Sequence, residues 1–156
     1  MESNYSAADA LRDVEAARAS TATHMATPWW YHPILAVILG VTTLMIGLDL
    51  ALPIALGILA VVAIAIGVLI AAYRHVSGGW ISFRQAGPRS RPLWYAYASS
   101  MAVLIILAVI ANHVLHLPWV AWMAAAFVFL ATISAGPVID RKVLEDIAAG
   151  EAGSQK

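Results

Sequence analysis

RHVSGGWISFRQAGPRSRP, residues 74–92, separates two long apolar blocks of the chain. Four of the nine basic residues lie in this segment: Arg74, Arg84, Arg89 and Arg91. Basic residues gather in the cytoplasmic connections of membrane proteins. The segment therefore indicates a membrane protein whose two apolar halves are joined by a cytoplasmic loop.

Composition supports a membrane location. Of the 156 residues, 62% are apolar and only 12% are charged, whereas about a quarter of the residues in a soluble domain are charged. There are no cysteines, which excludes disulfides, thiolate metal sites and cysteine nucleophiles. Residues 1–27 are polar and alanine-rich and do not resemble a secretory signal. We expect the first apolar block to be retained as a membrane anchor.

The apolar residues divide into four blocks that predict an all-α, four-transmembrane-helix bundle made of two hairpins. A spanning helix needs about 17–25 mainly apolar residues. The predicted spans are 33–50, 53–73, 93–112 and 118–139. They form a membrane domain over 29–142, with a tail at 1–28 and another at 143–156.

The distribution of basic residues predicts the orientation. The breaks between the first two and the last two blocks contain no Lys or Arg. The remaining five basic residues lie in the two tails: Arg12, Arg18, Arg141, Lys142 and Lys156. The positive-inside rule then puts both termini and the central loop in the cytoplasm. We expect a multi-pass protein of a bacterial cytoplasmic membrane.

A short amphipathic helix is predicted near the N-terminus, after a possible cap at Ser6. Its apolar stripe is thin, and Leu11 and Val14 are its main members. Two interpretations follow from this spacing. The helix lies on the membrane surface, or it docks onto a partner or a second copy of the chain.

Aromatic residues stand at the edges of the apolar blocks. Large rings that carry a polar N–H or O–H favour the headgroup region. The predicted interfacial anchors are Trp29, Trp30, Tyr31, Trp94, Tyr95 and Trp119. An aromatic cage for a ligand, built from the residues around Trp29 to His32, is the alternative.

One helix face is predicted to pack against another helix. Ala63, Gly67 and Ala71 form a small-xxx-small stripe in the second block. Small side chains let two helix backbones approach closely in a membrane. We expect this stripe to take part in assembly.

The central loop carries apolar rings among its arginines. Residues predicted to contact lipid or a partner here are Trp80, Phe83, Arg84, Arg89 and Arg91. The rings would enter the membrane interface while the guanidinium groups bind anionic headgroups at the cytoplasmic side. A platform for a partner protein is the alternative, and the few basic residues argue against nucleic acid.

Few residues suggest chemistry. Charged groups inside a membrane are usually functional, and Asp49, at the outer end of the first span, is the one candidate for a coupling carboxylate. His113 and His116 lie three residues apart and are weak candidates for a metal site, although interfacial histidines beside a turn look the same. No nucleotide-binding loop is present. We expect no catalytic residue and no cofactor.

The C-terminal residues predict a solvated end of the last helix. Arg141 and Glu145, and likewise Lys142 and Asp146, have the spacing of i,i+4 ion pairs. The two halves of the chain also share one order: aromatic belt, helix, turn, proline, helix, arginine. Internal duplication explains this order, and so does any pair of helical hairpins with aromatic belts.

Three motifs carry a resemblance to a known group. They are TPWWYHP before the first span, AYRHVSGGW after the second, and DRK after the last. Together they resemble small four-span membrane proteins of actinobacteria, over about residues 27–142. That group has no assigned activity, so the resemblance implies a fold and no site.

The sequence favours a non-enzymatic role. The leading hypothesis is an accessory or scaffold subunit that assembles with itself, as a homo-oligomer, or with another membrane protein in a larger complex. One alternative is a small homo-oligomeric transporter or channel for apolar or cationic substrates. A membrane enzyme that acts on lipid or prenyl substrates is the other, with His113, His116 and Asp49 at its outer surface.

Overall fold

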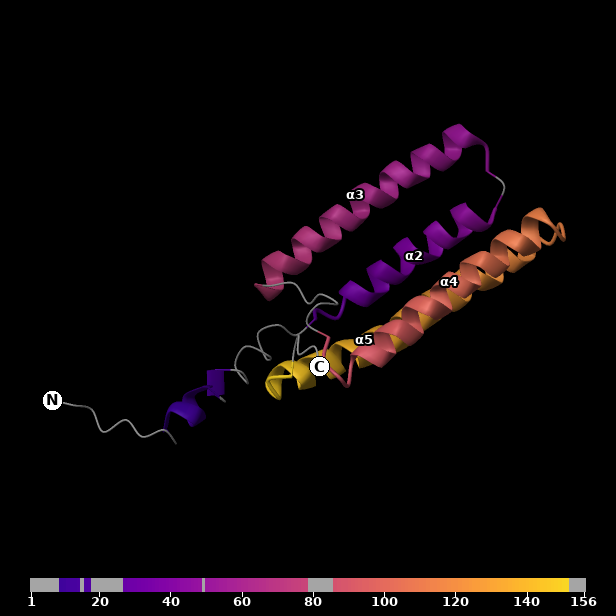
Figure 1. The fold of residues 1–156 in the computed structure, drawn as a ribbon. Helices are drawn as coiled ribbons and strands as arrows, with labels where there is room; N and C mark the ends of the chain where they lie inside the picture. Colours follow the sequence, from indigo (N-terminus) through magenta and orange to yellow (C-terminus); the bar gives the residue numbers. More distant parts are fainter. Residues whose placement is uncertain (1–8, 15, 18–26, 49, 79–85, 152–156) are drawn as a thin grey trace.

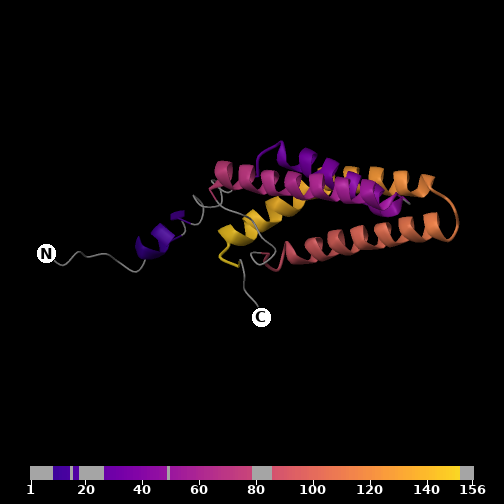
Figure 2. The ribbon, with the colours of Figure 1, turned by 90° about the horizontal axis from the view of Figure 1, so that it is seen from above.

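The computed structural model describes residues 9–14, 16–17, 27–48, 50–78 and 86–151. These residues form helices and connections, with no strand among them. Four long helices follow one another: α2 (Tyr31–Gly47), α3 (Leu52–Ser77), α4 (Arg91–His113) and α5 (Trp119–Ala148). They run up and down beside one another (Figures 1 and 2).

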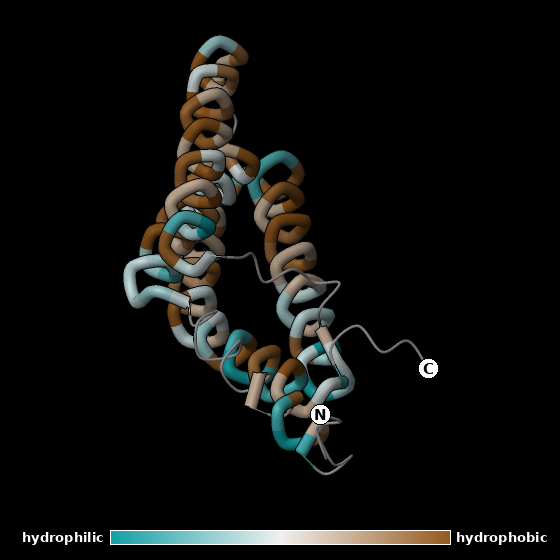
Figure 3. The backbone as a smooth tube through the Cα atoms, turned by 90° about the vertical axis from the view of Figure 1, so that its left-hand side faces the viewer, coloured by the Kyte–Doolittle hydropathy of each residue, from teal (hydrophilic) through white to brown (hydrophobic). Residues whose placement is uncertain are grey.

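Three of these helices, α3, α4 and α5, are long and apolar enough to cross a membrane. The apolar helix α2 is shorter, with 17 residues. Figure 3 shows hydrophobic residues along the helices and hydrophilic ones mainly toward their ends. The all-helical fold and the presence of several membrane-length helices agree with the predictions from sequence.

Local sequence explains where the helices begin and end. Pro53 lies in the first turn of α3, where a missing backbone N–H costs nothing. The same helix ends at Gly78, whose φ of 64° is left-handed and favours glycine. It runs past the apolar block through Arg74 and His75, because basic groups suit the C-terminal end of a helix dipole.

Each helix presents one end to the same side of the bundle. We call this side the basic end: there α2 and α4 begin, and α3 and α5 end, at the lower left of Figure 1. It carries Arg74, Arg89 and Arg91 together with Arg141 and Lys142 of α5. At the opposite end, which we call the turn end, two short connections join α2 to α3 and α4 to α5.

The helix α5 holds the bundle together. It packs closely along α2 and also contacts α4, whereas α3 packs on the bundle mainly through α2. Small residues allow this closeness: a Cβ at Gly47 would lie 2.9 Å from the Cβ of Ala121. The second helices of the two halves are therefore not equivalent in their packing.

Two apolar clusters lie on either side of α2 and α5. One joins α2 to α3 through Ile38, Val62 and Leu69, with Trp30 packed against it. The other lies at the basic end, where Trp94 and Tyr97 of α4 pack against Ile139 and Val143 of α5. Between them lies the polar region described next.

Candidate functional site

A polar cluster at the basic end brings together residues from distant parts of the chain. Nε2 of His32, near the start of α2, lies 3.0 Å from Oδ2 of Asp140 in α5. The Thr27 hydroxyl donates to the same carboxylate oxygen and lies 3.5 Å from the Tyr73 hydroxyl of α3. Both side chains of the central pair are largely shielded, with 9% of His32 and 17% of Asp140 exposed.

A cavity of about 210 Å³ adjoins this pair. We call it the His32–Asp140 cavity, and all four long helices contribute to its wall. Its lining residues are Tyr31, His32, Leu35, Leu39, Tyr73, Trp94, Tyr97, Thr132, Gly136, Ile139 and Asp140. The rings of Tyr31 and Tyr73 are tilted against each other, with centroids 4.9 Å apart. The wall therefore combines aromatic rings with one carboxylate and one imidazole.

Gly136 brings the His32 ring against α5. A Cβ at position 136 would lie 2.3 Å from His32 Nδ1 and 2.6 Å from Cε1, distances that real side chains do not tolerate. Pro137 follows inside the helix and supplies no backbone N–H. The absence of a side chain at Gly136 thus lets the imidazole lie directly against α5.

A hydrogen bond between Tyr97 and Thr132 closes the cavity toward the middle of the bundle. The Thr132 hydroxyl donates to the carbonyl oxygen of Val128 at 2.7 Å. The Tyr97 hydroxyl lies 2.7 Å from the same Thr132 oxygen and is therefore the donor of that second bond.

We expect Tyr97→Phe to lower the free energy of unfolding by about 1 kcal/mol, the usual net worth of one such bond. The change leaves the ring and the Thr132–Val128 bond in place. Thermal unfolding of the purified protein in detergent measures it. Ser134→Ala is the control, because the Ser134 hydroxyl is exposed and donates only to carbonyl oxygens of its own helix; it should unfold nearly as the wild type does.

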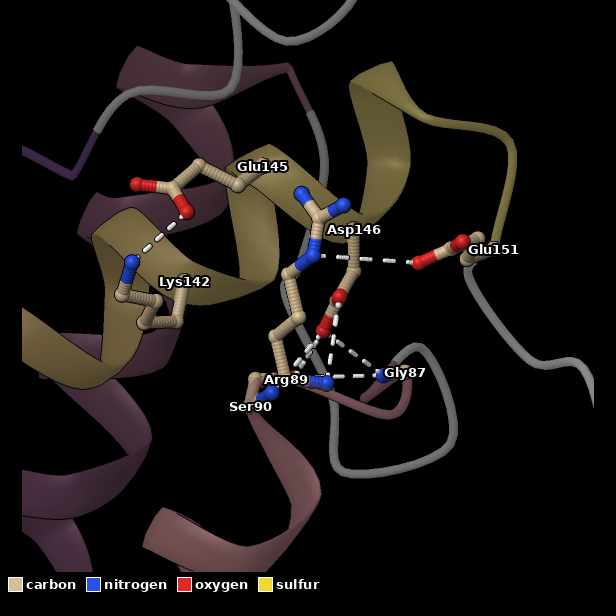
Figure 4. A network of polar contacts seen from close by, with 7 residues as sticks. All are labelled: Gly87, Arg89, Ser90, Lys142, Glu145, Asp146 and Glu151. Atoms are coloured by element: carbon tan, nitrogen blue, oxygen red, sulfur yellow. Dashed lines mark hydrogen bonds and ion pairs between the residues drawn. The ribbon is translucent and has the colours of Figure 1, made fainter.

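A second polar cluster fastens the end of the central loop to α5 (Figure 4). We call it the Asp146 cluster: Asp146 accepts hydrogen bonds from Gly87, Arg89 and Ser90. The backbone N–H groups of Gly87 and Ser90 lie 3.1 and 3.0 Å from Oδ2, and the Ser90 hydroxyl lies 2.6 Å from it. The backbone N–H of Arg89 reaches Oδ1 at 3.3 Å. The carboxylate lies just before α4 and satisfies N–H groups that the helix itself leaves free.

Asp146 lies past the apolar part of α5 and is fully buried by the loop, with 0% of the residue exposed. Burial raises the pKa of this carboxyl, but the hydrogen bonds from Ser90, Arg89 and Gly87 outweigh it and hold the pKa below its ordinary value. Gly87 is required for the approach, because a Cβ there would lie 2.7 Å from Asp146 Cγ.

The predicted pair of Lys142 with Asp146 is wrong. Lys142 Nζ instead lies 2.8 Å from Glu145 Oε2, one turn away at i,i+3. Asp146 faces the loop, where several N–H donors surround it at once. A buried carboxylate gains more from such donors than from one exposed ammonium group.

The predicted aromatic anchors fall into two groups. Trp29, Tyr95 and Trp119 are exposed on the described surface, and their place at a membrane interface stays a prediction. Tyr31 and Trp94 instead line the His32–Asp140 cavity. Trp30 packs against the cluster between α2 and α3.

The small-residue stripe of α3 lies on an open face. Ala63, Gly67 and Ala71 are all exposed, and no heavy atom would lie within 4 Å of a Cβ at Gly67. Within the described bundle the close helix contacts are made elsewhere, at Gly47 and Ala121. The role of the stripe in assembly remains a prediction.

The turn end holds the two histidines considered for a metal. His113 and His116 line a shallow depression together with Asn112 and Pro118, and both histidines are exposed. No group of three His, Asp or Glu side chains that could share a metal lies within the described ranges. Asp49 falls outside them.

The other predicted contact residues are only partly described. Leu11 and Val14 are exposed on a helical segment that includes residues 9–14 and 16–17. In the central loop, Arg91 donates to the Ala86 carbonyl oxygen at 3.1 Å, and Arg89 lies 4.0 Å from Glu151. The three remaining members lie outside the described residues: Trp80, Phe83 and Arg84.

Sequence reasoning missed both polar clusters. It assigned His32 to the membrane edge and took the acidic residues after Ile139 as a solvated helix end. A local signal for Asp140 exists in the Gly136–Pro137 step, which marks a special position in an otherwise alanine-rich helix. Nothing near Asp146 in the sequence points to Ser90.

No protein-family model matches the chain, and neither does any curated protein or any solved structure. Function must therefore be inferred from the geometry of these helices and clusters.

Proposed function

We propose that the chain is a four-span protein of a bacterial cytoplasmic membrane, with both termini and the central loop in the cytoplasm. The basic end carries the arginines, and the turn end has none. At 17 residues α2 is about 26 Å long, a little short of a bilayer core of about 30 Å. Its packing along α5 supports counting it as the fourth span. The helix near Leu11 and Val14 then lies on the cytoplasmic surface, where the loop arginines meet anionic headgroups.

Within that membrane we propose a non-enzymatic accessory or scaffold subunit that assembles with itself or with another membrane protein. The packing of α3 carries this proposal. A helix of 26 residues is held to the bundle mainly by α2, and its buried residues form one stripe: Val62, Leu69, Tyr73 and Ser77. Ile58 and Ala65 flank this stripe, and the face on the other side of the helix is open.

The open face of α3 favours a second copy of the chain as the partner. The face is uncharged between Leu52 and Tyr73, so lipid and another apolar helix are both acceptable neighbours. The small residues Ala63, Gly67 and Ala71 make a shallow groove. The same groove on a second copy of the chain, related by a twofold axis, would pack against it. Lipid chains fill such a groove less closely than a second helix does.

We expect Gly67→Leu to weaken self-association by about ten-fold or more without lowering the unfolding temperature of the monomer. The added side chain has room within one chain but fills the groove that a partner would enter. Mass and stoichiometry measured in mild detergent, over a range of protein concentrations, give the association constant.

Gly57→Leu is the matched control, because Gly57 also has open space and lies off the stripe on the same helix. The control should associate as the wild type does. Unchanged association of the Gly67→Leu protein would contradict the proposal, as would a strictly monomeric wild type purified without other subunits. A different membrane protein that is retained by wild type and lost in Gly67→Leu would replace the second copy as partner.

A small homo-oligomeric transporter is the second candidate, and the His32–Asp140 cavity favours it. A carboxylate facing a cavity at the end of a helix bundle is a feature of sites that bind substrates or protons. Loss of a measurable efflux phenotype in Asp140→Asn, with protein levels unchanged, would rank this candidate first.

A further inference from the structure

The His32–Asp140 cavity has the size of a small organic molecule. Its volume is about 210 Å³, and a cavity of about 150 Å³ in another protein holds benzene. A single aromatic ring with a short polar substituent therefore fits. The chemistry of the wall decides which substituent is favoured.

The carboxylate of Asp140 is held by neutral donors. Thr27 donates a hydroxyl hydrogen to it, and His32 Nε2 lies 3.0 Å away. Among the described residues no Lys or Arg forms an ion pair with Asp140. Both contacts are made to the Oδ2 atom of Asp140.

The hydrogen bonds around His32 fit a donor at Nε2 and a lone pair at Nδ1. The Nδ1 atom is buried and has no hydrogen-bond partner within the described part of the chain, and an N–H donor left unsatisfied there would be costly. In this arrangement Nε2 donates to Asp140. The carboxylate of Asp140 supplies the negative charge of the cluster.

Aromatic rings surround this charge. Tyr31, Tyr73, Trp94 and Tyr97 come from three different helices and line the same cavity. The face of an aromatic ring is electronegative and attracts cations. A cavity wall with several rings and one carboxylate suits a positively charged group with an apolar body.

We infer that the His32–Asp140 cavity is a binding site for a small organic cation, an ammonium group attached to an apolar body of about one ring. The ammonium group lies against Asp140, and the apolar body lies against the aromatic rings. This inference rests on the cavity alone and does not depend on assembly through α3.

A groove on the outer side of α4 and α5 offers a way in from the membrane. It measures about 390 Å³ and shares Tyr97 and Ile139 with the cavity. The other lining residues are mainly apolar, such as Phe127 and Ala131. An amphiphilic cation that partitions into a bilayer reaches the cavity by passing these two shared side chains.

The test compares two ligands of nearly the same shape. The full chain in detergent is titrated calorimetrically with 3-phenylpropylammonium and with the neutral 3-phenylpropan-1-ol. We expect saturable binding of the cation and binding of the alcohol weaker by about ten-fold or more. Equal affinity for the two ligands, or no saturable binding of the cation, would overturn the inference without any variant.

Asp140→Asn supplies the second arm. The amide keeps an oxygen that accepts from Thr27 and His32 but removes the charge, so cation binding should fall by about ten-fold or more while alcohol binding stays unchanged. Glu145→Gln is the matched control. Glu145 is a partly exposed carboxylate of the same helix that pairs with Lys142, and the Glu145→Gln protein should bind the cation as the wild type does. A folded Asp140→Asn protein that binds the cation with wild-type affinity would contradict the assignment of the cavity as a cation site.

Discussion

Asp146→Asn is expected to lower the free energy of unfolding by about 3 kcal/mol. The amide has nearly the same size, but it removes the charge and turns one acceptor into a donor. That donor then faces a backbone N–H of Gly87, Arg89 or Ser90, which lie around the carboxylate. Thermal unfolding in detergent, followed by helical circular dichroism, measures the loss.

Glu145→Gln is the control for this prediction, because Glu145 precedes Asp146 in the same helix and its one ion pair, with Lys142, is partly exposed. We expect it to change stability by less than about 0.5 kcal/mol. Ser90→Ala should fall between the two, since it removes one hydroxyl donor and keeps the backbone donors. Equal stability of Asp146→Asn and Glu145→Gln would contradict the account of the Asp146 cluster.

Acid should reproduce part of the Asp146→Asn effect. The pKa of Asp146 is lowered in the folded protein, so its contribution to stability is full above the pKa of the unfolded chain. It is lost as the pH falls through the lowered folded value. The wild type should therefore lose stability on acidification relative to Asp146→Asn, and the two unfolding curves should converge at low pH. A constant gap at every pH would exclude the ionised carboxylate as the cause.

Gly136→Ala is expected to lower the free energy of unfolding by about 2–3 kcal/mol. Alanine normally stabilises a helix relative to glycine by about 1 kcal/mol, so the expected sign is opposite to the usual one. The reason is the His32 ring, whose Nδ1 atom would lie 2.3 Å from the new Cβ. The ring must move, which breaks its contact with Asp140 and changes the cavity.

A double variant separates this contact from every other effect of the substitution. In a His32→Ala background the ring is absent, and Gly136→Ala should then stabilise the protein by up to about 1 kcal/mol. Thermal unfolding of the wild type, the two single variants and the double variant gives the sign of the Gly136→Ala effect in each background. Destabilisation of the same size in both backgrounds would place its cause in the α5 backbone beside Pro137 instead of at His32.

The helical fold was predictable because its signals are local. Arginines at one end of each apolar block, and prolines at positions 53 and 118, mark the helices without reference to their neighbours. The predicted spans and the observed helices differ in their bounds because a helix continues as long as its backbone hydrogen bonds do. The helix α3 therefore runs on to Ser77, beyond the apolar block that was predicted to end at residue 73.

The site was not predictable because it depends on which helices touch. Asp140 meets His32 across 108 residues of sequence, and no spacing rule connects positions so far apart. The pairing follows from the close packing of α5 on α2, which small residues such as Gly47 and Ala121 permit. The sequence suggested the small-residue face of α3 instead, since its regular spacing is easier to recognise than a close approach between two different helices.

The bonds of Asp146 to the end of the central loop also bear on the order in which the protein is assembled. They join residues 56 to 59 positions apart, so they cannot form until both α4 and α5 exist and lie antiparallel. Until then the N–H of Gly87 has the nearby Ser90 hydroxyl as a partner, whereas that of Ser90 is left to water. Folding of this part of the loop is therefore coupled to the arrival of the last helix and does not precede it. In Asp146→Asn the helices α4 and α5 would still pack together, but the end of the loop would no longer gain the hydrogen bonds to the carboxylate.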